Sequence, residues 1–406
     1  MDTATAVDLE RARALDAADP LGGYRERFVI RDPELIYLDG NSLGRLPRAT
    51  VDRLTDVVEG GWGRELIRGW EHWIDDPVRV GDAIAQIVGA WPGEIVVTDS
   101  TTVNLYKLAW AALEARPGRG ALITDRDNFP TDRYVLEGLA AARDLTIRWI
   151  EADPVEGPQP VDVAAILDGD VALVSLSLVN YRSAAIADLE AITRLAHEAG
   201  SLVLWDLSHA AGAVPVELQG TGADLAVGCT YKYLNGGPGA PAWLYVRREL
   251  QDRLRSPIQG WFGQGDQFAM GQGFTPAAGI RGWQAGTPGI LALAAVEEGV
   301  RMVADAGIDA IRAKSAALTS YAIELHDAWL APLDFRLGTP RDPARRGSHM
   351  AVRHPDARRL CAQLIASRVI PDFREPDSIR LGLSPLYTSF AEIHAGMARL
   401  RDLAAA

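Results

Sequence analysis

Cysteine is scarce in this sequence. Only Cys229 and Cys361 occur among 406 residues, so the chain cannot build a disulfide framework. Neither cysteine has the neighbouring ligands of a zinc knuckle, and we expect no metal site. The N-terminus, MDTATAVDLERARALDAADP, is acidic and lacks the apolar core of a signal peptide. These features predict a cytoplasmic protein.

Excess positive charge and long hydrophobic runs are also lacking. Lys and Arg number 41 against 54 Asp and Glu, a net charge of −13, so no overall positive field attracts phosphodiester backbones or anionic lipid. The longest uncharged stretch, from Gly282 to Val296, is about 15 residues long, whereas about 20 are needed to span a bilayer. We therefore expect neither nucleic acid nor a membrane as a partner.

The composition is otherwise ordinary for a globular protein, with 48% hydrophobic and 23% charged residues. Between about residues 95 and 246, short apolar runs alternate with helical patterns; the runs are EIVVT, ALIT, LTIRWI, VALVSLSLV, SLVLW, DLAVG and AWLYV. Strands that are apolar on both faces and separated by helices form parallel sheets covered on both sides. The pattern predicts an α/β domain with a mostly parallel seven-stranded sheet.

The pattern changes after residue 290. A long helical stretch, interrupted at Gly307, precedes two strand patterns, HMAVR and SIRLGL, and a last helix from Ser389. These elements predict a small C-terminal α+β domain. We expect three parts: an N-terminal segment (1–60) that packs on both domains, the large α/β domain (61–290), and a linking helix with the small domain (291–406).

Two polar positions directly follow buried strands, where parallel α/β sheets bind their ligands. Asp206 ends the run LVLWD, and His209 lies three residues later. A carboxylate at a buried strand end needs a cation, although a helix-capping Asp206 with a structural His209 is an equal alternative. Lys232 follows DLAVG and precedes a glycine-rich turn. Burial favours the neutral amine of a lysine, which is the nucleophile that imine formation with an aldehyde requires.

Two further positions carry aromatic or hydroxyl side chains. The run ALIT leads to Phe129, whose ring either stacks on a planar ligand or serves only in packing. Ser100, Thr101 and Thr102 lie at the start of an expected helix, where hydroxyls and free backbone N–H groups bind an anion. The same residues are also sufficient as a simple helix cap.

Together these positions form the layout expected for pyridoxal 5′-phosphate (PLP). Lys232, 26 residues after Asp206, would carry the aldehyde as a Schiff base. Asp206 would pair with the pyridinium nitrogen and make the ring an electron sink. The hydroxyl-bearing helix start would bind the phosphate, and an aromatic side chain would cover the ring.

Four segments make the sequence similar to a known family. In chain order they are DNFPTDRY, WDLSHAAGAVPVEL, CTYKYLNGGPGAP and GWFG, and the similarity extends from YLDGNSLGRLP (37–47) to IRLGLSPLYTSF (379–390). The sequence resembles kynureninase, a PLP-dependent hydrolase of fold type I in the aspartate aminotransferase superfamily. The resemblance implies hydrolysis of L-kynurenine to anthranilate and L-alanine in the kynurenine pathway of tryptophan catabolism, which supplies pyridine nucleotide biosynthesis. A second candidate substrate is 3-hydroxykynurenine, which would give 3-hydroxyanthranilate.

The resemblance also implies a role for each matching residue. Lys232 is the Schiff-base lysine, Asp206 the pyridinium partner, and Tyr231 a residue of phosphate binding and proton transfer. Arg380 matches the arginine that holds the substrate α-carboxylate. The other cofactor contacts match Thr101, Thr102, Phe129, Pro130, Thr131, Asp132, Ser177, His209, Trp261 and Thr287. In the family the last two positions reach the phosphate from the partner subunit, so we expect a homodimer with shared active sites.

Alternatives remain open at this stage. Position 287 is Asn in some family members and Thr here, so the preferred kynurenine is undecided, and His72 and Trp73 receive no role. A cysteine desulfurase shares the fold, the Asp and the Lys, but it needs a mobile, exposed cysteine, whereas Cys361 lies on an apolar helical pattern. A plain aminotransferase and a PLP-fold protein that has lost catalysis are further alternatives.

Overall fold

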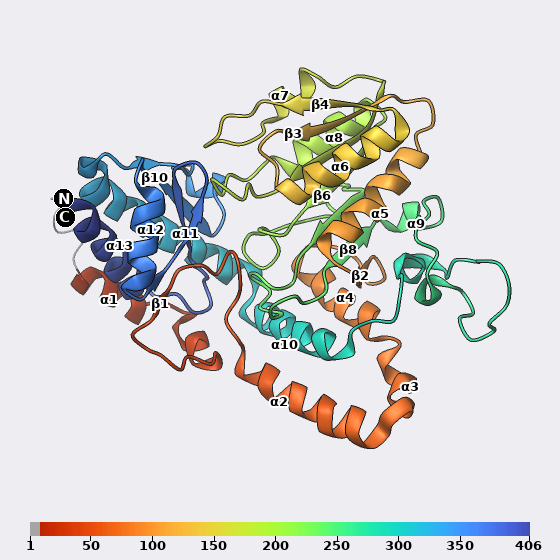
Figure 1. Cartoon of the computed structure of the whole chain (residues 1–406), viewed down its shortest axis with the longest axis horizontal. Coiled ribbons are helices and arrows are strands. Elements are labelled where there is room, and N and C mark those ends of the chain that lie inside the picture. Colours follow the sequence, from red (N-terminus) through yellow and green to blue (C-terminus); the bar gives the residue numbers. More distant parts are fainter. Residues whose placement is uncertain (1–8) are drawn as a thin grey trace.

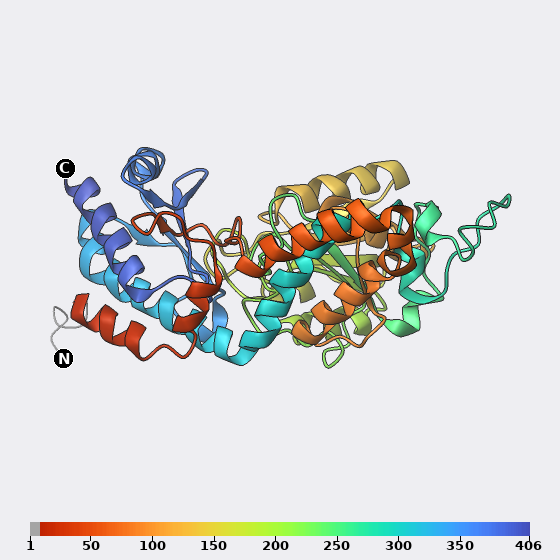
Figure 2. The same cartoon turned by 90° about the horizontal axis from the view of Figure 1, so that it is seen from below.

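The computed structural model describes residues 9–406, and two bodies lie along its longest axis in Figure 1. The larger body contains the main sheet and its covering helices, and the smaller body contains the C-terminal elements together with α1 (Leu9–Ala17). Helix α10 (Ile290–Ala306) runs along the large body toward the small one, as Figure 2 shows. The segment between α9 (Arg248–Gln251) and α10 projects from the far end of the large body.

Seven strands form the main sheet within residues 9–406, in the order β2-β8-β7-β6-β5-β3-β4. Strand β8 is antiparallel to both of its neighbours, and the remaining strands share one direction. Each strand coincides with one of the seven apolar runs, which confirms the mostly parallel sheet predicted from the sequence. The bounds are β2 (Ile95–Val97), β3 (Ala121–Asp125), β4 (Thr146–Ile150), β5 (Val171–Ser177), β6 (Leu202–Asp206), β7 (Leu225–Gly228) and β8 (Trp243–Val246).

The sheet is buried on both faces because successive side chains of a strand point to opposite sides. In β6, Val203 and Trp205 join one hydrophobic cluster, and Leu202 and Leu204 join another. Helices α4, α8 and α10 cover the first cluster, and α5 and α6 cover the second. Apart from α10, their bounds are α4 (Asp76–Ile87), α5 (Thr101–Glu114), α6 (Pro130–Arg143) and α8 (Leu189–Glu198). With both faces covered, the strand ends are the accessible places for polar chemistry.

The C-terminal part of the small body is an antiparallel sheet with helices α11, α12 and α13, which confirms the predicted C-terminal α+β fold. Its strand order is β12-β13-β10-β9, and in the β10–β13 pair His349 lies opposite Gly382. The last helix starts after Ser389, whose side chain caps the helix together with Glu392. The bounds are α11 (Ile308–Leu325), β9 (Arg336–Leu337), β10 (His349–Arg353), α12 (Ala357–Ala366), β12 (Asp372–Arg374), β13 (Ser378–Gly382) and α13 (Phe390–Ala405).

The N-terminal segment contacts both bodies. Helix α1 packs against α13, β1 (Ile36–Tyr37) pairs in parallel with β11 (Val369–Ile370), and α2 (Arg48–Asp56) packs against α10. Helix α10 also packs against α4, and Gly307, with a φ of 77°, separates it from α11. The division of the chain at residues 60 and 290 remains a proposal.

Two short helices complete the large body, α3 (Trp70–Trp73) and α7 (Pro160–Ala164). Among the helices of residues 9–406, none combines the length and the apolar character that crossing a membrane requires.

Candidate active site

A cavity of about 320 Å³ opens where the parallel strands of the main sheet end. It is bordered by the segments after β5, β6 and β7 and by the starts of α5 and α6, as expected for ligand sites in α/β sheets. Nine residues predicted from the sequence line it together: Thr101, Thr102, Phe129, Thr131, Ser177, Asp206, His209, Tyr231 and Lys232.

Lys232 is the reactive amine candidate at the centre of this cavity. It is 9% exposed, and its Nζ atom lies 2.9 Å from Nε2 of His209 and 5.7 Å from the centroid of the Phe129 ring. Burial, and next the charge of Lys232, lower the pKa of His209 well below its ordinary value, so the imidazole is neutral. A neutral imidazole can accept a hydrogen bond from the lysine amine.

Asp206 and Asp132 form a buried pair of carboxyl groups. Asp206 ends β6 and accepts a hydrogen bond from the Ser208 backbone N–H at 2.7 Å. Asp132, in the first turn of α6, is 0% exposed, and burial and the neighbouring Asp206 raise its pKa well above the usual range. Burial and Asp206 outweigh the opposing effects of Lys232 and Asn128 on this pKa, so a carboxylate at Asp132 is stable only by sharing a proton with Asp206 or by facing a cation.

An aromatic wall stands beside Lys232. Phe129 precedes α6, which begins at Pro130 as a proline-initiated helix, and its ring meets Tyr181 edge-to-face at 5.3 Å between centroids. Asn128 fixes this turn, because its Oδ1 atom accepts hydrogen bonds from the Phe129 backbone N–H at 2.8 Å and from the Ser177 hydroxyl at 2.7 Å. A planar ligand bound beside Lys232 can therefore stack against the Phe129 ring.

The N-terminus of α5 forms the polar end of the cavity. Ser100 caps the helix by accepting from the Val103 N–H, and the hydroxyls of Thr102 and Thr131 lie 2.7 Å apart. The neighbouring Cys229 thiol, burial and Asp206 raise the pKa of Tyr231, so its phenol stays protonated and able to donate. Hydroxyl donors and a helix N-terminus together suit a phosphate group.

A buried lysine that the sequence patterns did not single out holds this polar end in place. Lys107, 0% exposed in α5, donates to Asp99 Oδ2 at 2.6 Å and to the Trp283 carbonyl at 2.7 Å. Asp99 directly precedes Ser100 and has a φ of 48°, a left-handed conformation that is uncommon outside glycine. Lys107 thus ties the start of α5 to the loop that leads to Thr287.

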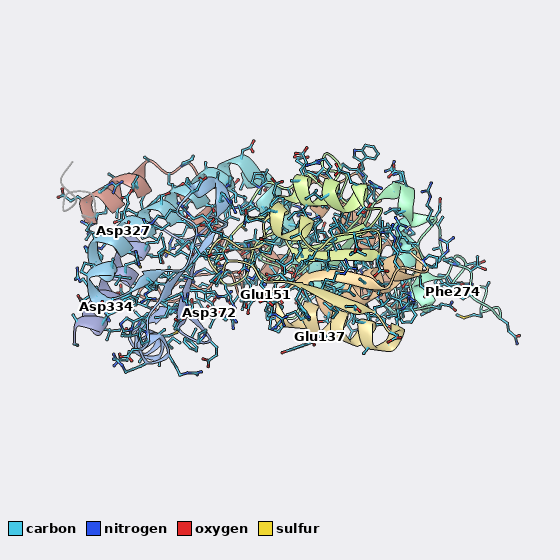
Figure 3. All side chains as sticks on the ribbon, turned by 90° about the horizontal axis from the view of Figure 1, so that it is seen from above. Glu137, Glu151, Phe274, Asp327, Asp334 and Asp372 are labelled. Atoms are coloured by element: carbon cyan, nitrogen blue, oxygen red, sulfur yellow. The ribbon has the colours of Figure 1, made fainter. Side chains whose placement is uncertain are left out.

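Arg380 lies beside the cavity but does not line it. Its guanidinium is 1% exposed and donates from Nε to Asp372 Oδ1 at 2.8 Å and from Nη1 to the Tyr181 carbonyl at 2.5 Å. Figure 3 labels Asp372 near the junction of the two bodies. Tyr181 lines the cavity, so Arg380 is separated from the cavity by the residue to which it donates.

Trp261 and Thr287 lie outside the main cavity of their own chain. Trp261 is 45% exposed in the projecting segment, and its indole N–H donates to the Gln267 carbonyl at 2.6 Å. Phe274, on the same segment, is labelled at the far end of the molecule in Figure 3. Thr287 lines a neighbouring cavity of about 400 Å³, which shares Ser100, Gly239 and Ala240 with the first. A single chain therefore does not bring these two residues to the cavity lined by Lys232.

Ser208 and Tyr181 are cavity residues that were not assigned from the sequence. Ser208 accepts a hydrogen bond from the Cys229 backbone N–H at 3.2 Å, which ties the segment after β6 to the segment after β7. Its position between Asp206 and His209, directly after a buried strand, could have indicated that Ser208 belongs to the site. Tyr181 lies after β5, four residues beyond Ser177, and only its contact with Phe129 reveals its place in the wall.

The cavity residues fit PLP. The buried pair of Asp132 and Asp206 suits a pyridinium nitrogen, whose positive charge would offset the burial of these carboxyl groups. The hydroxyl-lined start of α5 suits the phosphate, the Phe129 ring suits the cofactor face, and Lys232 is the amine for its aldehyde. This site, on a mostly parallel sheet with a small C-terminal body, defines a PLP-dependent enzyme of fold type I.

Comparison with known proteins assigns the chain to one family within this class. A kynureninase from Pseudomonas fluorescens is 44% identical over 94% of this chain and 91% of its own length, and one from Burkholderia pseudomallei (strain 1106a) is 42% identical over 97% and 95%. The model of the kynureninase C-terminal domain matches residues 311–400. The chain belongs to the kynureninase family.

Solved structures agree on the fold. A cysteine desulfurase from Thermococcus onnurineus NA1 matches with a TM-score of 0.81 at 19% identity, covering 93% of this chain and 99% of that one. A C-DES variant with glycine covalently linked to its PLP cofactor matches with a TM-score of 0.80 at 17% identity, covering 91% and 97%. At such identities the likeness concerns the fold alone.

Both cysteines are buried, which bears on the desulfurase alternative. Cys361 is 3% exposed in α12, as its apolar helical pattern predicts, and burial raises the pKa of its thiol to about 11. Burial likewise raises the pKa of the Cys229 thiol. Neither residue has the exposed, readily ionised thiol that persulfide formation needs.

Proposed function

We propose that this protein hydrolyses L-kynurenine to anthranilate and L-alanine with PLP as its cofactor. The observation that supports this most directly is the buried Lys232 amine beside Asp206 and the Phe129–Tyr181 wall, in a chain of the kynureninase family. The substrate is a small molecule. The preference between kynurenine and 3-hydroxykynurenine is part of what the experiment below decides.

Each residue has a defined task in this reaction. When bound, PLP supplies an electron sink for the electrons released at the substrate Cα. Lys232 would be the residue that holds the cofactor aldehyde, and its free amine would be placed to remove the substrate Cα proton. Asp206 would keep a proton on the ring nitrogen by a charge-assisted hydrogen bond. The Asp132 carboxyl lies next to Asp206.

The remaining groups bind and orient. The α5 N-terminus, Thr102 and the protonated Tyr231 phenol hold the phosphate. The Phe129 ring fixes the cofactor plane. Arg380, whose planar fork matches a carboxylate, binds the substrate α-carboxylate from the small body. In the hydrolysis, the carbonyl carbon of the aryl ketone gains the hydroxyl of water and leaves as the carboxyl group of anthranilate, and Cβ gains a proton to become the methyl group of alanine.

The working unit we propose is a cytoplasmic homodimer with shared active sites. Large apolar side chains are exposed on the single chain, among them Trp62 at 60%, Ile67 at 78% and Phe268 at 64%. An apolar groove of about 470 Å³ lies between the segment 57–73, which follows α2 and includes α3, and the start of α10; Trp62, Ile67, Trp70, Trp73 and Leu291 line it. Exposed apolar area of this kind is typical of a protein–protein interface. A second copy is the partner proposed for it.

A steady-state assay tests the proposed function. Purified protein loaded with PLP is given kynurenine, 3-hydroxykynurenine or cysteine, and the arylamine, alanine and sulfide products are quantified. Equal amounts of arylamine and alanine from one of the kynurenines, abolished in Lys232→Ala, are expected. Sulfide from cysteine with no arylamine would replace this proposal by a desulfurase, and transfer of the amino group to a keto acid would indicate an aminotransferase.

A further inference from the structure

His349 is a buried imidazole to which the reaction above gives no task. It begins β10 of the small body and is 0% exposed, and neither ring nitrogen has a hydrogen-bond partner among residues 9–406. Leaving a buried polar group without a partner is costly, so an imidazole in this position needs a compensating role. Its ring faces His209, with 5.2 Å between the centroids.

His209 connects this ring to the reactive amine. Its Nε2 atom lies 2.9 Å from Lys232 Nζ, and its Nδ1 atom is buried without a partner among the described residues. When Lys232 donates to Nε2, the neutral imidazole must carry its proton on Nδ1. That buried N–H then requires an acceptor, and the His349 ring is the polar side chain that faces it, tilted by 49°.

Burial and the surrounding charges keep the His349 imidazole neutral. Burial, and next the charge of Arg380, lower its pKa to about 3, with Asp372 opposing and Lys232 adding to this effect. The groups that act on His209 are Lys232, His349, Arg380 and Arg374. The Tyr181 carbonyl, which accepts from Arg380, also lies near the His349 ring but outside hydrogen-bonding geometry. A His349 N–H turned toward that carbonyl leaves the other ring nitrogen as an acceptor.

We propose that His349 is a positioning residue that fixes the tautomer of His209, so that the Nε2 lone pair of His209 faces Lys232. Lys232, His209 and His349 then form one polar chain from the large body to the small one. The chain stabilises a proton on Lys232 Nζ, because the opposite His209 tautomer would point an N–H at that atom. This inference rests on the proposed function, since it concerns the nitrogen that reacts with PLP.

The test is a spectroscopic titration of the PLP-loaded protein. The protonated linkage of Lys232 to PLP absorbs at about 420 nm, and the pH at which half of this band is lost measures the proton affinity of Nζ. His349→Leu should lower this midpoint by about one pH unit, which is about tenfold in proton affinity. His349→Gln, which retains an acceptor, should keep the wild-type midpoint. His326→Leu, which removes a buried histidine (2% exposed) elsewhere in the small body, is the matched control.

An unchanged midpoint in His349→Leu, or an equal shift in His349→Gln, overturns the proposal. Should His349→Leu not fold, the wild-type protein still decides the question. Its ¹⁵N-labelled histidines, with the His209 signal assigned by comparison with His209→Gln, should report a proton on Nδ1 and none on Nε2, and the reverse tautomer overturns the proposal. A wild-type protein that lacks the 420 nm band or does not cleave kynurenine contradicts the proposed function instead.

Discussion

Asp372 and Arg380 lie directly opposite each other on β12 and β13 and form a two-pronged ion pair. Although burial raises the pKa of Asp372, hydrogen bonds from Arg380 bring it below its ordinary value. The pair holds the guanidinium plane at a fixed angle beside the Tyr181 carbonyl. The guanidinium fork is therefore preset, so the proposed contact with a substrate carboxylate would not have to order a flexible side chain.

The first prediction concerns this fork. Arg380→Lys keeps the charge but cannot bond Asp372, Tyr181 and a carboxylate in one plane, so KM for kynurenine should rise about tenfold or more. Absorbance of the bound PLP should not change, because Arg380 does not line the cofactor cavity. Steady-state kinetics with the spectrum as control measure both. Kinetics identical to those of the wild type would exclude Arg380 as the carboxylate site.

The second prediction is that Lys232 alone reacts with PLP. Borohydride reduction of the loaded protein followed by peptide mapping should place the pyridoxyl mass on the Lys232 peptide. Lys107 is an internal comparison, since it is also buried but is held by Asp99 and the Trp283 carbonyl. The mass on any other peptide would contradict the assignment of the site.

The third prediction concerns Asp206. Asp206→Ala should retain some PLP through Lys232 but lose about a hundredfold or more in kcat, because the charge-assisted hydrogen bond that keeps the ring nitrogen protonated is lost. Asp132 lies beside it but cannot replace it fully, since burial raises the pKa of Asp132 even without the contribution of Asp206. Full kcat in Asp206→Ala would mean that another group holds the ring nitrogen.

The fourth prediction concerns Lys107. Lys107→Met leaves Asp99 without its cation and releases the Trp283 carbonyl, and since Asp99 is partly exposed the free energy of unfolding should fall by up to about 3 kcal/mol. The α5 start should then bind PLP more weakly. Denaturant unfolding and PLP titration measure the two effects. Lys107→Met with Asp99→Asn should recover stability more than PLP affinity, and parallel recovery of both would reduce Lys107 to a stabilising role.

The fifth prediction addresses the shared site. Lys232→Ala and Trp261→Ala chains should each be inactive alone. In a mixed dimer one site carries both defects and the other neither, so up to about half of the mixed dimer's sites should work. If Trp261 is instead an ordinary loop residue of a monomer, mixing the two chains restores no activity. Sedimentation that finds a fully active monomer would likewise end the dimer proposal.

Local patterns in the sequence were sufficient for the sheet and for Asp206, His209, Lys232, Phe129 and the start of α5, whereas Ser177 and Tyr231 were expected only from the family resemblance. The seven strands are apolar on both faces, so each is visible as a run, and Asp206 and Lys232 stand out because they follow such runs directly. Asp132, by contrast, is recognisable as a carboxyl partner of Asp206 only once α6 is placed beside β6. Likewise, the hydrogen bond from Lys107 to the Trp283 carbonyl is visible only in the folded chain, because the two residues are 176 positions apart. Contacts of this range depend on tertiary packing, which no local pattern encodes.

Helices α10 and α11 meet at Gly307, whose φ of 77° and ψ of 134° suit glycine alone. One helix packs on the large body and the other belongs to the small body, so this residue is a single-residue joint between the body that holds Lys232 and the body that holds Arg380 and His349. Any rotation of one body against the other would be concentrated at this joint and in the N-terminal segment that also crosses between them. A side chain at position 307 would be strained at this positive φ, and relief of that strain would change the angle between α10 and α11, and with it the placement of Arg380 and His349 relative to Lys232.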